Sequence, residues 1–355
     1  MTTIEVRRQV VGGVDTHKHT HHAALLDAAT GRLLGDQEFP ANRGGYRQML
    51  DWFRSFGAPG AIGIEGTGSF GAGLTRHLDA EGIETVEVMR PNRQSRRLYG
   101  KSDPIDAIAA ARAVLSGLAT AKPKPRNGSV EAIRLLRTTR SSAAKARHAA
   151  INQIHATLWC GPEDLRDALG SYSRAALVAR CARLRPSGDL SDPAVAAKTV
   201  LRGLARRIQA LDVEIAETDE QLKKLTAAAA PTLSAVFGAG PDAVAQLLTT
   251  AGDNPHRINS EAALARLCGT APVPASSGTV TRHRLHRGGD RQANRTLHLI
   301  VISRLRWHEP TKAYVERRTL EGKTKKEIIR CLKRAVVREI FRALQADFAA
   351  LTPTP

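Results

Sequence analysis

The sequence predicts an α/β region followed by a mostly helical region. Residues 9 to about 118 alternate short apolar runs with segments of helical spacing, the pattern of a sheet covered by helices. Beyond the Pro-, Gly- and Lys-rich segment 121–129, the strand patterns give way to long helical ones. We therefore expect an N-terminal α/β domain over residues 9–120, a helical linker domain over residues 129–228 and a mostly helical C-terminal domain over residues 230–348.

The N-terminal region predicts a mixed sheet. Its first strands are separated by short turns, which indicates an antiparallel start, and the later ones are separated by helices. The last predicted helix has Pro104 in its first turn, where the missing N–H costs nothing. The expected elements, in order, are strands 9–15, 20–27 and 32–39, helix 44–56, strand 61–65, helix 69–82, strand 85–90 and helix 103–117.

A heptad pattern dominates the predicted linker domain. Apolar residues and one threonine recur there at alternating spacings of three and four: Leu201, Leu204, Ile208, Leu211, Ile215, Thr218, Leu222 and Leu225. Such a seam predicts packing against another long helix. The partner is either the helix predicted over residues 130–159 of the same chain or the same helix of a second subunit, which would make a dimerising coiled coil.

The charge of the chain indicates a polyanionic partner. The 53 Lys and Arg residues outnumber the 34 Asp and Glu residues, which gives a formal net charge of +19. Solubility needs far less charge than this, so nucleic acid is the expected partner. Aromatic residues make up 4% of the chain, which disfavours recognition of single strands by stacked rings.

Two classes of protein are disfavoured by composition. The four cysteines are widely separated and form no C-x-x-C pair, which argues against a zinc knuckle and against a secreted disulfide framework. Nor does the sequence hold an apolar run of the roughly 18 residues that a membrane span needs. We therefore expect a cytoplasmic protein with no membrane partner.

Four acidic residues form the first candidate site. Asp15 ends the first predicted strand and Glu65 the fourth, while Asp103 and Asp106 lie three apart on one face of the following helix. If the strands are ordered as in a ribonuclease H-like sheet, the first and fourth are neighbours and the four carboxylates converge. Carboxylates held close together raise one another's pKa unless cations bind, and oxygen ligands suit Mg²⁺ or Mn²⁺. Metal ions held in this way can clamp a phosphodiester under attack.

The histidines beside Asp15 are expected to play no metal-binding part. His17, His19, His21 and His22 lie in or just after the turn that follows the first strand, and no Cys or further His at ligand spacing accompanies them. We expect solvated side chains there. A phosphate contact by His17 or Lys18 is the alternative.

The second candidate site is a serine loop in the C-terminal domain. Pro272 and Pro274 predict an extended entry to Ser276-Ser277-Gly278, and several arginines follow. A serine in a rigid loop among guanidinium groups can attack a phosphate, with the arginines stabilising the transition state. The alternative is a polar loop that only contacts DNA. The residues predicted to contact nucleic acid are Lys101, Arg282, Arg284, Arg287, Arg291, Lys333 and Arg334.

The last helix is expected to begin at a capping box formed by Thr324 and Glu327. It has an apolar stripe and a basic face, so we expect it to pack against the core on one side and to contact phosphates on the other.

Taken together, four stretches resemble the insertion sequence one-ten family of DEDD transposases, relatives of the Piv-type DNA invertases. They are GVDTHK, IEGTGSFG, RPNRQSRRLYGKSDPIDAIAAARAVL and LCGTAPVPASSGTVTRHRLHRGGDRQANRTLH, and the match extends from about residue 10 to 348. The resemblance implies a RuvC-like N-terminal domain whose DEDD acids are Asp15, Glu65, Asp103 and Asp106. It also implies a C-terminal transposase domain whose nucleophilic serine directly precedes a glycine, which is Ser277 here.

The resemblance further implies a reaction and its partners. We expect a bacterial, nucleoid-associated transposase that cuts and rejoins donor and target double-stranded DNA through a covalent phosphoserine, with Mg²⁺ (or Mn²⁺) at the DEDD site. A noncoding bridge RNA and assembly into a homo-oligomer, a dimer or a tetramer, are implied as well. Two alternatives stay open at this point: a RuvC-like, structure-specific junction resolvase that uses water as its nucleophile, and a non-catalytic nucleic-acid-binding protein.

Overall fold

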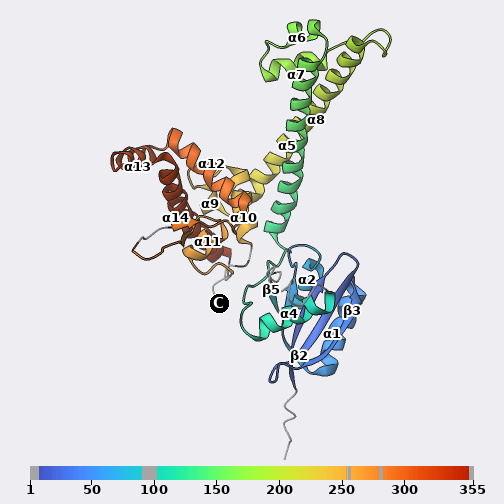
Figure 1. Ribbon diagram of the computed structural model, residues 1–355, viewed down its shortest axis with the longest axis vertical. Coiled ribbons are helices and arrows are strands. Elements are labelled where there is room, and N and C mark those ends of the chain that lie inside the picture. The colour runs from blue at the N-terminus through green and yellow to red at the C-terminus, as the bar shows by residue number, and fades with distance from the viewer. Residues whose placement is uncertain (1–7, 90–101, 253, 255–256, 280–282, 352–355) are drawn as a thin grey trace, which may run out of the picture. The chain divides into compact units, whose positions relative to one another are not determined.

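The chain folds into two compact units. The computed structural model describes residues 8–89, 102–252, 254, 257–279 and 283–351. The first unit is formed by residues up to Gly128 and by Ala251–Asn259, and the second by Ser129–Thr250 and the residues from Ser260 onward. A mixed α/β sheet with its helices makes up most of the first unit, and the second is mostly helical (Figure 1).

A five-stranded sheet forms the centre of the first unit, with the order β3-β2-β1-β4-β5. The strands are β1 (Gln9–Thr16), β2 (Thr20–Asp27), β3 (Leu33–Pro40), β4 (Ala58–Glu65) and β5 (Glu84–Val88). β1 pairs with β2 and β2 with β3 in antiparallel fashion, whereas β1 with β4 and β4 with β5 are parallel. The prediction that the first and fourth strands are neighbours is therefore confirmed.

Two adjacent glycines of β1 face opposite sides of the sheet because strand side chains alternate. A Cβ on Gly13 would lie 2.2 Å from the Ala107 carbonyl oxygen and the Ala111 nitrogen, so helix α4 (Asp103–Leu115) packs directly on β1 at this point. A Cβ on Gly12 would instead lie 3.2 Å from Phe53 of α1 (Arg43–Phe56). Helix α4 thus covers one face of the sheet, and α1 covers the other.

The main apolar core of this unit lies on the face that α1 and α2 (Ala72–Ala80) cover. Its largest fully buried side chains include Met49, Leu50, Phe53, Leu74 and Leu78. On the other face, the buried residues of α4 are Asp106, Ala107, Ala110 and Ala111.

Most predicted elements of this unit are present, with shifted ends. β4 begins at Ala58, three residues before the predicted start, and α2 is shorter than the predicted helix 69–82. The N-cap of α4 is Ser102, so Asp103 is the first helical residue and Asp103 does not serve as the cap.

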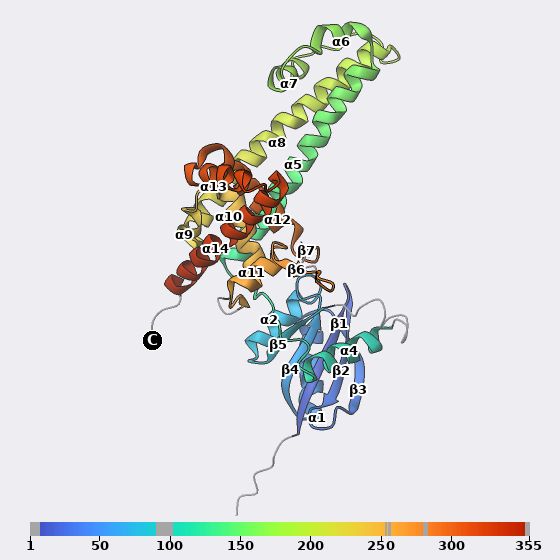
Figure 2. The same ribbon diagram turned by 60° about the vertical axis from the view of Figure 1, so that its left-hand side comes forward.

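A long helical hairpin opens the second unit. Helices α5 (Ser129–Cys160) and α8 (Pro193–Ala229) pack side by side, and α6 (Glu163–Leu169) and α7 (Arg174–Ala182) lie at their far end (Figure 2). Arg140 forms an ion pair with Asp219, and Arg147 forms one with Asp212, so the two helices run antiparallel. Every residue of the predicted heptad seam is buried or half-buried. The intrachain partner of the seam is confirmed, and a dimerising coiled coil stays a prediction.

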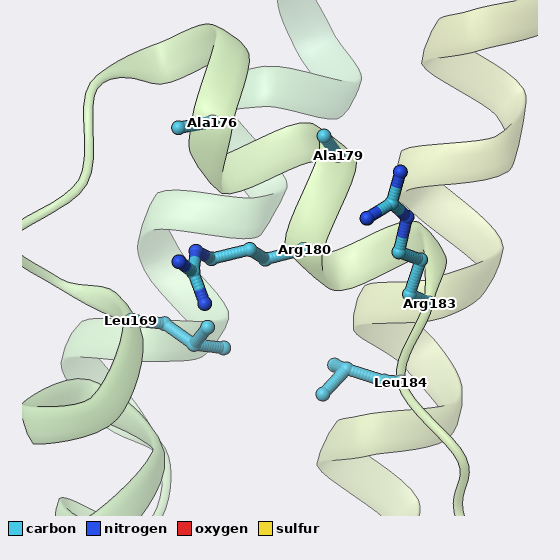
Figure 3. A pocket seen from close by; sticks show the side chains of 6 residues that line it. All are labelled: Leu169, Ala176, Ala179, Arg180, Arg183 and Leu184. Atoms are coloured by element: carbon cyan, nitrogen blue, oxygen red, sulfur yellow. The ribbon is translucent and has the colours of Figure 1, made fainter.

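A cavity of about 470 Å³ lies beside α7, near the far end of the hairpin (Figure 3). The Arg180 guanidinium also lies 3.9 Å from the centre of the Tyr172 ring. The cavity is lined by Leu169, Ala176, Ala179, Arg180, Arg183 and Leu184. These side chains carry no carboxylate, hydroxyl or thiol group, so the lining offers no acid, base or nucleophile for catalysis.

The rest of the second unit is a compact group of helices with a short hairpin. Its elements are α9 (Pro231–Ser234), α10 (Pro241–Ala251), α11 (Glu261–Leu267), β6 (Pro272–Pro274), β7 (His283–Leu285), α12 (Arg291–Trp307), α13 (Glu309–Leu320) and α14 (Lys325–Leu351). The buried Arg304 of α12 forms two hydrogen bonds, of 2.9 and 2.7 Å, to Glu339 of α14. The capping box before α14 is confirmed, because Glu327 accepts hydrogen bonds from both the backbone and the hydroxyl of Thr324. In the part of the chain that the structure describes, no helix has the length and apolarity of a membrane span.

Candidate active site

Two of the predicted acids lie at the ends of neighbouring parallel strands. Val14 of β1 pairs with Ile64 of β4, so the next residues, Asp15 and Glu65, lie side by side at the ends of their strands. Asp15 is 7% exposed and Glu65 is 9% exposed. The Thr16 hydroxyl donates a 2.7 Å hydrogen bond to the Glu65 carbonyl oxygen, which ties the two strand ends together.

The other two acids come from the first turn of α4. Asp103 is half-exposed there and Asp106, one turn later, is 5% exposed. Helix α4 touches β1 at Gly13, two residues before Asp15 on the same face of the strand. The close packing of glycine against the helix backbone therefore brings the acids of α4 to those of the sheet.

The four carboxylates influence one another electrostatically. Burial raises the pKa of Asp15, and the negative charges of Glu65, Asp106 and Asp103 raise it further, while His17 lowers it. A positive charge placed among these carboxylates would relieve this repulsion. The structure thus brings together all four acids that the sequence singles out.

His17 is a member of this cluster that the sequence analysis did not assign to it. Its Nε2 lies 3.9 Å from Asp15 Oδ2, and its Nδ1 lies 3.8 Å from Asp103 Oδ2. One ligand atom each from Asp15, His17 and Asp103 lie within 4.8 Å of one another, a grouping that suits a metal ion. The available signal was the spacing Asp15-x-His17, because alternate residues of an extended strand share a face.

The neighbouring histidines lie elsewhere. His19 is exposed in the turn, His22 forms a 2.7 Å hydrogen bond with Asp36 of β3, and His21 is completely buried against Tyr46. Among the described residues, the one grouping that fits a metal ion is Asp15, His17 and Asp103, so these three histidines are not part of it.

The predicted serine loop lies between two short antiparallel strands. Pro274 of β6 pairs with His283 of β7, and Ser276, Ser277 and Gly278 follow β6, all of them exposed. Gly278 has a φ of 57°, in the left-handed region that glycine adopts at least cost. Ser277 is therefore presented to solvent at the tip of a hairpin, where it can meet a macromolecular substrate.

The base of this hairpin is fixed by a polar network. Asn294 of α12 donates hydrogen bonds of 2.9 and 3.0 Å to the carbonyl oxygens of Cys268 and Gly269, which lead into β6. Lys333 of α14 in turn donates a 2.5 Å hydrogen bond to the Asn294 side-chain oxygen. Gly289 must lack a Cβ, which would lie 2.3 Å from the Gly269 nitrogen. These contacts fix the segment that leads into β6 against α12 and α14.

The cysteine beside the hairpin is not a competing nucleophile. Cys268 is 1% exposed, and its burial raises the pKa of its thiol to about 12. Because the thiolate is the reactive form, the thiol of Cys268 is inert at neutral pH. Ser277, in contrast, is exposed.

The basic residues predicted to contact nucleic acid are placed in different ways. Arg284, Arg287 and Arg291 are exposed near the serine hairpin. Lys333 is engaged with Asn294, and Arg334 forms an ion pair with Glu261 of α11. Lys101 and Arg282 lie outside the described residues.

Comparisons with known proteins identify two transposase models along the chain. A family model described as "Transposase" matches residues 12–159, which include the four acids, and a model described as "Transposase IS116/IS110/IS902 family" matches residues 230–316, which include Ser277. Two similar proteins are a 42 kDa protein of insertion element IS900 from Mycobacterium paratuberculosis and a 43.6 kDa protein of insertion element IS110 from Streptomyces coelicolor.

These relatives match part of the chain. The first is 28% identical over 44% of this chain and 40% of its own length, and the second is 30% identical over 41% of this chain and 36% of its own length. The chain therefore aligns with less than half of each relative. The two family models, however, match in order along both units, and the chain belongs to the IS116/IS110/IS902 family of transposases.

Proposed function

We propose that this protein cuts and rejoins DNA as the transposase of an insertion sequence, through a covalent intermediate on Ser277 and with a divalent ion at the acidic cluster. The observation that supports this most strongly is the convergence of Asp15, Glu65, Asp103 and Asp106 in a member of a transposase family. The strand order β3-β2-β1-β4-β5 supports a ribonuclease H-like, RuvC-like domain around these acids.

The donor set of the acidic cluster fits Mg²⁺ or Mn²⁺. Both ions bind carboxylate oxygens, and the negative charges of Glu65, Asp106 and Asp103 act together on Asp15, raising its pKa. Asp15, Glu65, Asp103 and Asp106 would hold the ion. When bound, such an ion supplies positive charge that stabilises the extra negative charge on a phosphate under attack.

The chemistry assigned to Ser277 is two successive exchanges of a phosphoester bond. Its hydroxyl gives up its proton and attacks a DNA phosphorus; the Oγ–P bond forms while the P–O3′ bond breaks, and the departing O3′ takes up a proton. A 3′-hydroxyl from the other duplex then attacks the same phosphorus, forms a new P–O3′ bond and expels Ser277 as a hydroxyl. Each step exchanges one ester for another, so the reaction needs no external energy source.

The arginines near the hairpin have a matching part. Arg284, Arg287 and Arg291 are exposed close in sequence to Ser277, and guanidinium groups bind phosphate oxygens through paired hydrogen bonds. They would bind the DNA backbone and stabilise the charge of the five-coordinate phosphorus.

The partners follow from the family and from the charge. Donor and target double-stranded DNA are the proposed substrates, and the net charge of +19 suits this task. Guidance by a noncoding bridge RNA and assembly into a homo-oligomer rest on the family resemblance, and they belong to the proposal in that form.

Two serine variants test the proposal against a resolvase. The substrate is a supercoiled plasmid carrying the DNA that flanks the gene, incubated with Mg²⁺, with and without RNA transcribed from that flank. We expect Ser277→Ala and Asp103→Asn to abolish cleavage, whereas Ser276→Ala retains it. Undiminished cleavage by Ser277→Ala would show that water is the nucleophile, and equal cleavage without the RNA would remove the guide from the proposal.

A further inference from the structure

We propose that His17 is a nitrogen ligand of the ion at the acidic cluster, and that it makes the site select Mn²⁺ over Mg²⁺. This inference rests on the proposed function in one respect, namely that the cluster binds a divalent ion. It adds a fifth protein residue of a different donor type to the four carboxylates.

The position of the His17 ring supports this assignment. Its two nitrogens face two carboxylates, at 3.9 Å from Asp15 and 3.8 Å from Asp103. Both separations are too long for a direct hydrogen bond. An imidazole binds an ion through one of its nitrogens. One ligand atom each from Asp15, His17 and Asp103 lie within 4.8 Å of one another, close to the roughly 4.2 Å between two ligands that lie across an ion with bonds of about 2.1 Å.

The backbone holds His17 in this position. The His17 N–H donates a 3.0 Å hydrogen bond to the Thr20 carbonyl oxygen, which closes the tight turn between β1 and β2. β1 ends at Thr16, and His17 directly follows it with its ring toward Asp15 and Asp103. The His17 side chain is 44% exposed, which leaves room for water or a phosphate oxygen to complete the coordination.

The next histidine in the turn provides a matched comparison. His19 is exposed and, within the described residues, belongs to no group that could hold a metal ion. An imidazole two residues further along the same turn therefore has the same chemistry without the same placement.

A mixed set of oxygen and nitrogen donors distinguishes the two candidate ions. Mg²⁺ takes oxygen ligands and gives up its waters reluctantly, so an imidazole adds little to its binding. Mn²⁺ takes carboxylates and water as Mg²⁺ does and, as a transition-metal ion, also accepts an imidazole. His17 is expected to strengthen the binding of Mn²⁺ while leaving that of Mg²⁺ nearly unchanged.

Calorimetric titration of the full chain with Mn²⁺ and, separately, with Mg²⁺ tests this selectivity. We expect His17→Ala to weaken Mn²⁺ binding at least about tenfold and Mg²⁺ binding less than about threefold, while His19→Ala leaves both within about twofold. Unchanged thermal unfolding of the metal-free variants shows that they are folded. A His17→Ala variant that binds Mn²⁺ as the wild type does, or that weakens both ions equally, overturns the inference.

Electron spin echo spectroscopy of the Mn²⁺ complex provides a direct second readout. The wild type and His19→Ala should show the modulation of an imidazole nitrogen bound to Mn²⁺, and His17→Ala should lack it. Absence of that modulation in the wild type overturns the inference and leaves the carboxylate site intact. If the wild type binds neither ion, or if Asp15→Asn does not reduce binding, the proposed metal site itself fails, and the two failures are thus distinguishable.

Discussion

His21 is a titratable side chain enclosed in the apolar core of the first unit. It is 0% exposed, its ring stacks on Tyr46 at a centroid distance of 5.6 Å, and its Nε2 has no hydrogen-bond partner among the described residues. Burial lowers the pKa of His21 below its ordinary value of 6.5, more than the hydrogen bond to the Thr20 carbonyl raises it. The imidazole is therefore neutral in the folded protein at neutral pH.

This burial gives the fold a sensitivity to acid. Below about pH 6.5 the unfolded chain protonates His21 while the folded protein resists, so the unfolded state binds more protons and the free energy of unfolding falls as the pH falls. The loss grows until the pH passes below the lowered pKa of the folded state, where it levels off.

Replacement of His21 by Phe should remove this contribution. Phe keeps the ring stacked on Tyr46 and has no nitrogen to protonate, so the free energy of unfolding should fall less between pH 7 and pH 5 than in the wild type. Denaturant titrations at both pH values measure the difference, and His19→Phe in the exposed turn is the control. A pH dependence equal to that of the wild type would show that His21 is not responsible.

The packing of α4 on β1 is the contact between elements that positions the acidic cluster. It depends on small residues, because Gly13 faces the backbone of Ala107 and Ala111 at a distance that leaves no room for a Cβ. Overpacking at such a contact either strains the fold or displaces the helix, and with it Asp103 and Asp106.

Two glycine-to-alanine substitutions should therefore have opposite effects. Gly13→Ala should destabilise the fold by about 1–3 kcal/mol or more and abolish metal binding, because its Cβ collides with the backbone of α4. Gly203→Ala, in α8 with no atom within 4 Å of the added Cβ, should stabilise the fold by about 0.5–1 kcal/mol through helix propensity. Thermal unfolding and Mn²⁺ titration measure both, and a Gly13→Ala protein as stable as the wild type would contradict this packing.

The sequence predicted β1, β2 and α4 because each of them has a signal within its own few residues. The apolar runs fix β1 and β2, and the spacing of Asp103 and Asp106 gives both one helix face. The start of β4 was missed because Ala58, Pro59 and Gly60 favour strand poorly by themselves; pairing with Gln9 and Val10 of β1 makes them a strand. Long-range pairing of this kind leaves no local signal.

The same difference between local and long-range signals explains which features of the candidate site the sequence could predict. Convergence of the acids could be predicted from strand order, since the ends of neighbouring parallel strands meet. The role of His17 could not be separated from that of its neighbours, because four histidines lie within six residues and only the folded turn distinguishes them. The hydrogen bond between Lys333 and Asn294 joins residues 39 apart in the sequence, and no sequence pattern predicts it.

At the scale of the whole molecule, the acidic cluster and the serine loop belong to different units. Asp15 lies in the first unit and Ser277 in the second. Assembly of a complete site from two subunits would restrain stray cutting, because a lone subunit could not cut.

Mixing two inactive variants tests whether subunits share the site. Asp15→Asn and Ser277→Ala should each be inactive alone, and a mixture should recover cleavage, since one subunit supplies the intact acids and the other the intact serine. The measurement is plasmid cleavage at fixed total protein, with Asp15→Asn mixed with Asp103→Asn as the control that cannot complement. If the mixture is as inactive as its components, the Asp15 and the Ser277 that act together belong to the same subunit.

Isolation of a covalent complex between protein and DNA tests the phosphoserine step most directly. Reactions stopped with detergent should contain DNA bound to the protein through a 5′-phosphate, and mass spectrometry of the digested complex should locate the nucleotide on Ser277. Ser276→Ala should still form the complex and Ser277→Ala should not. If cleavage proceeds but labelled DNA never migrates with the protein, or if the nucleotide is found on another residue, the account of Ser277 is wrong.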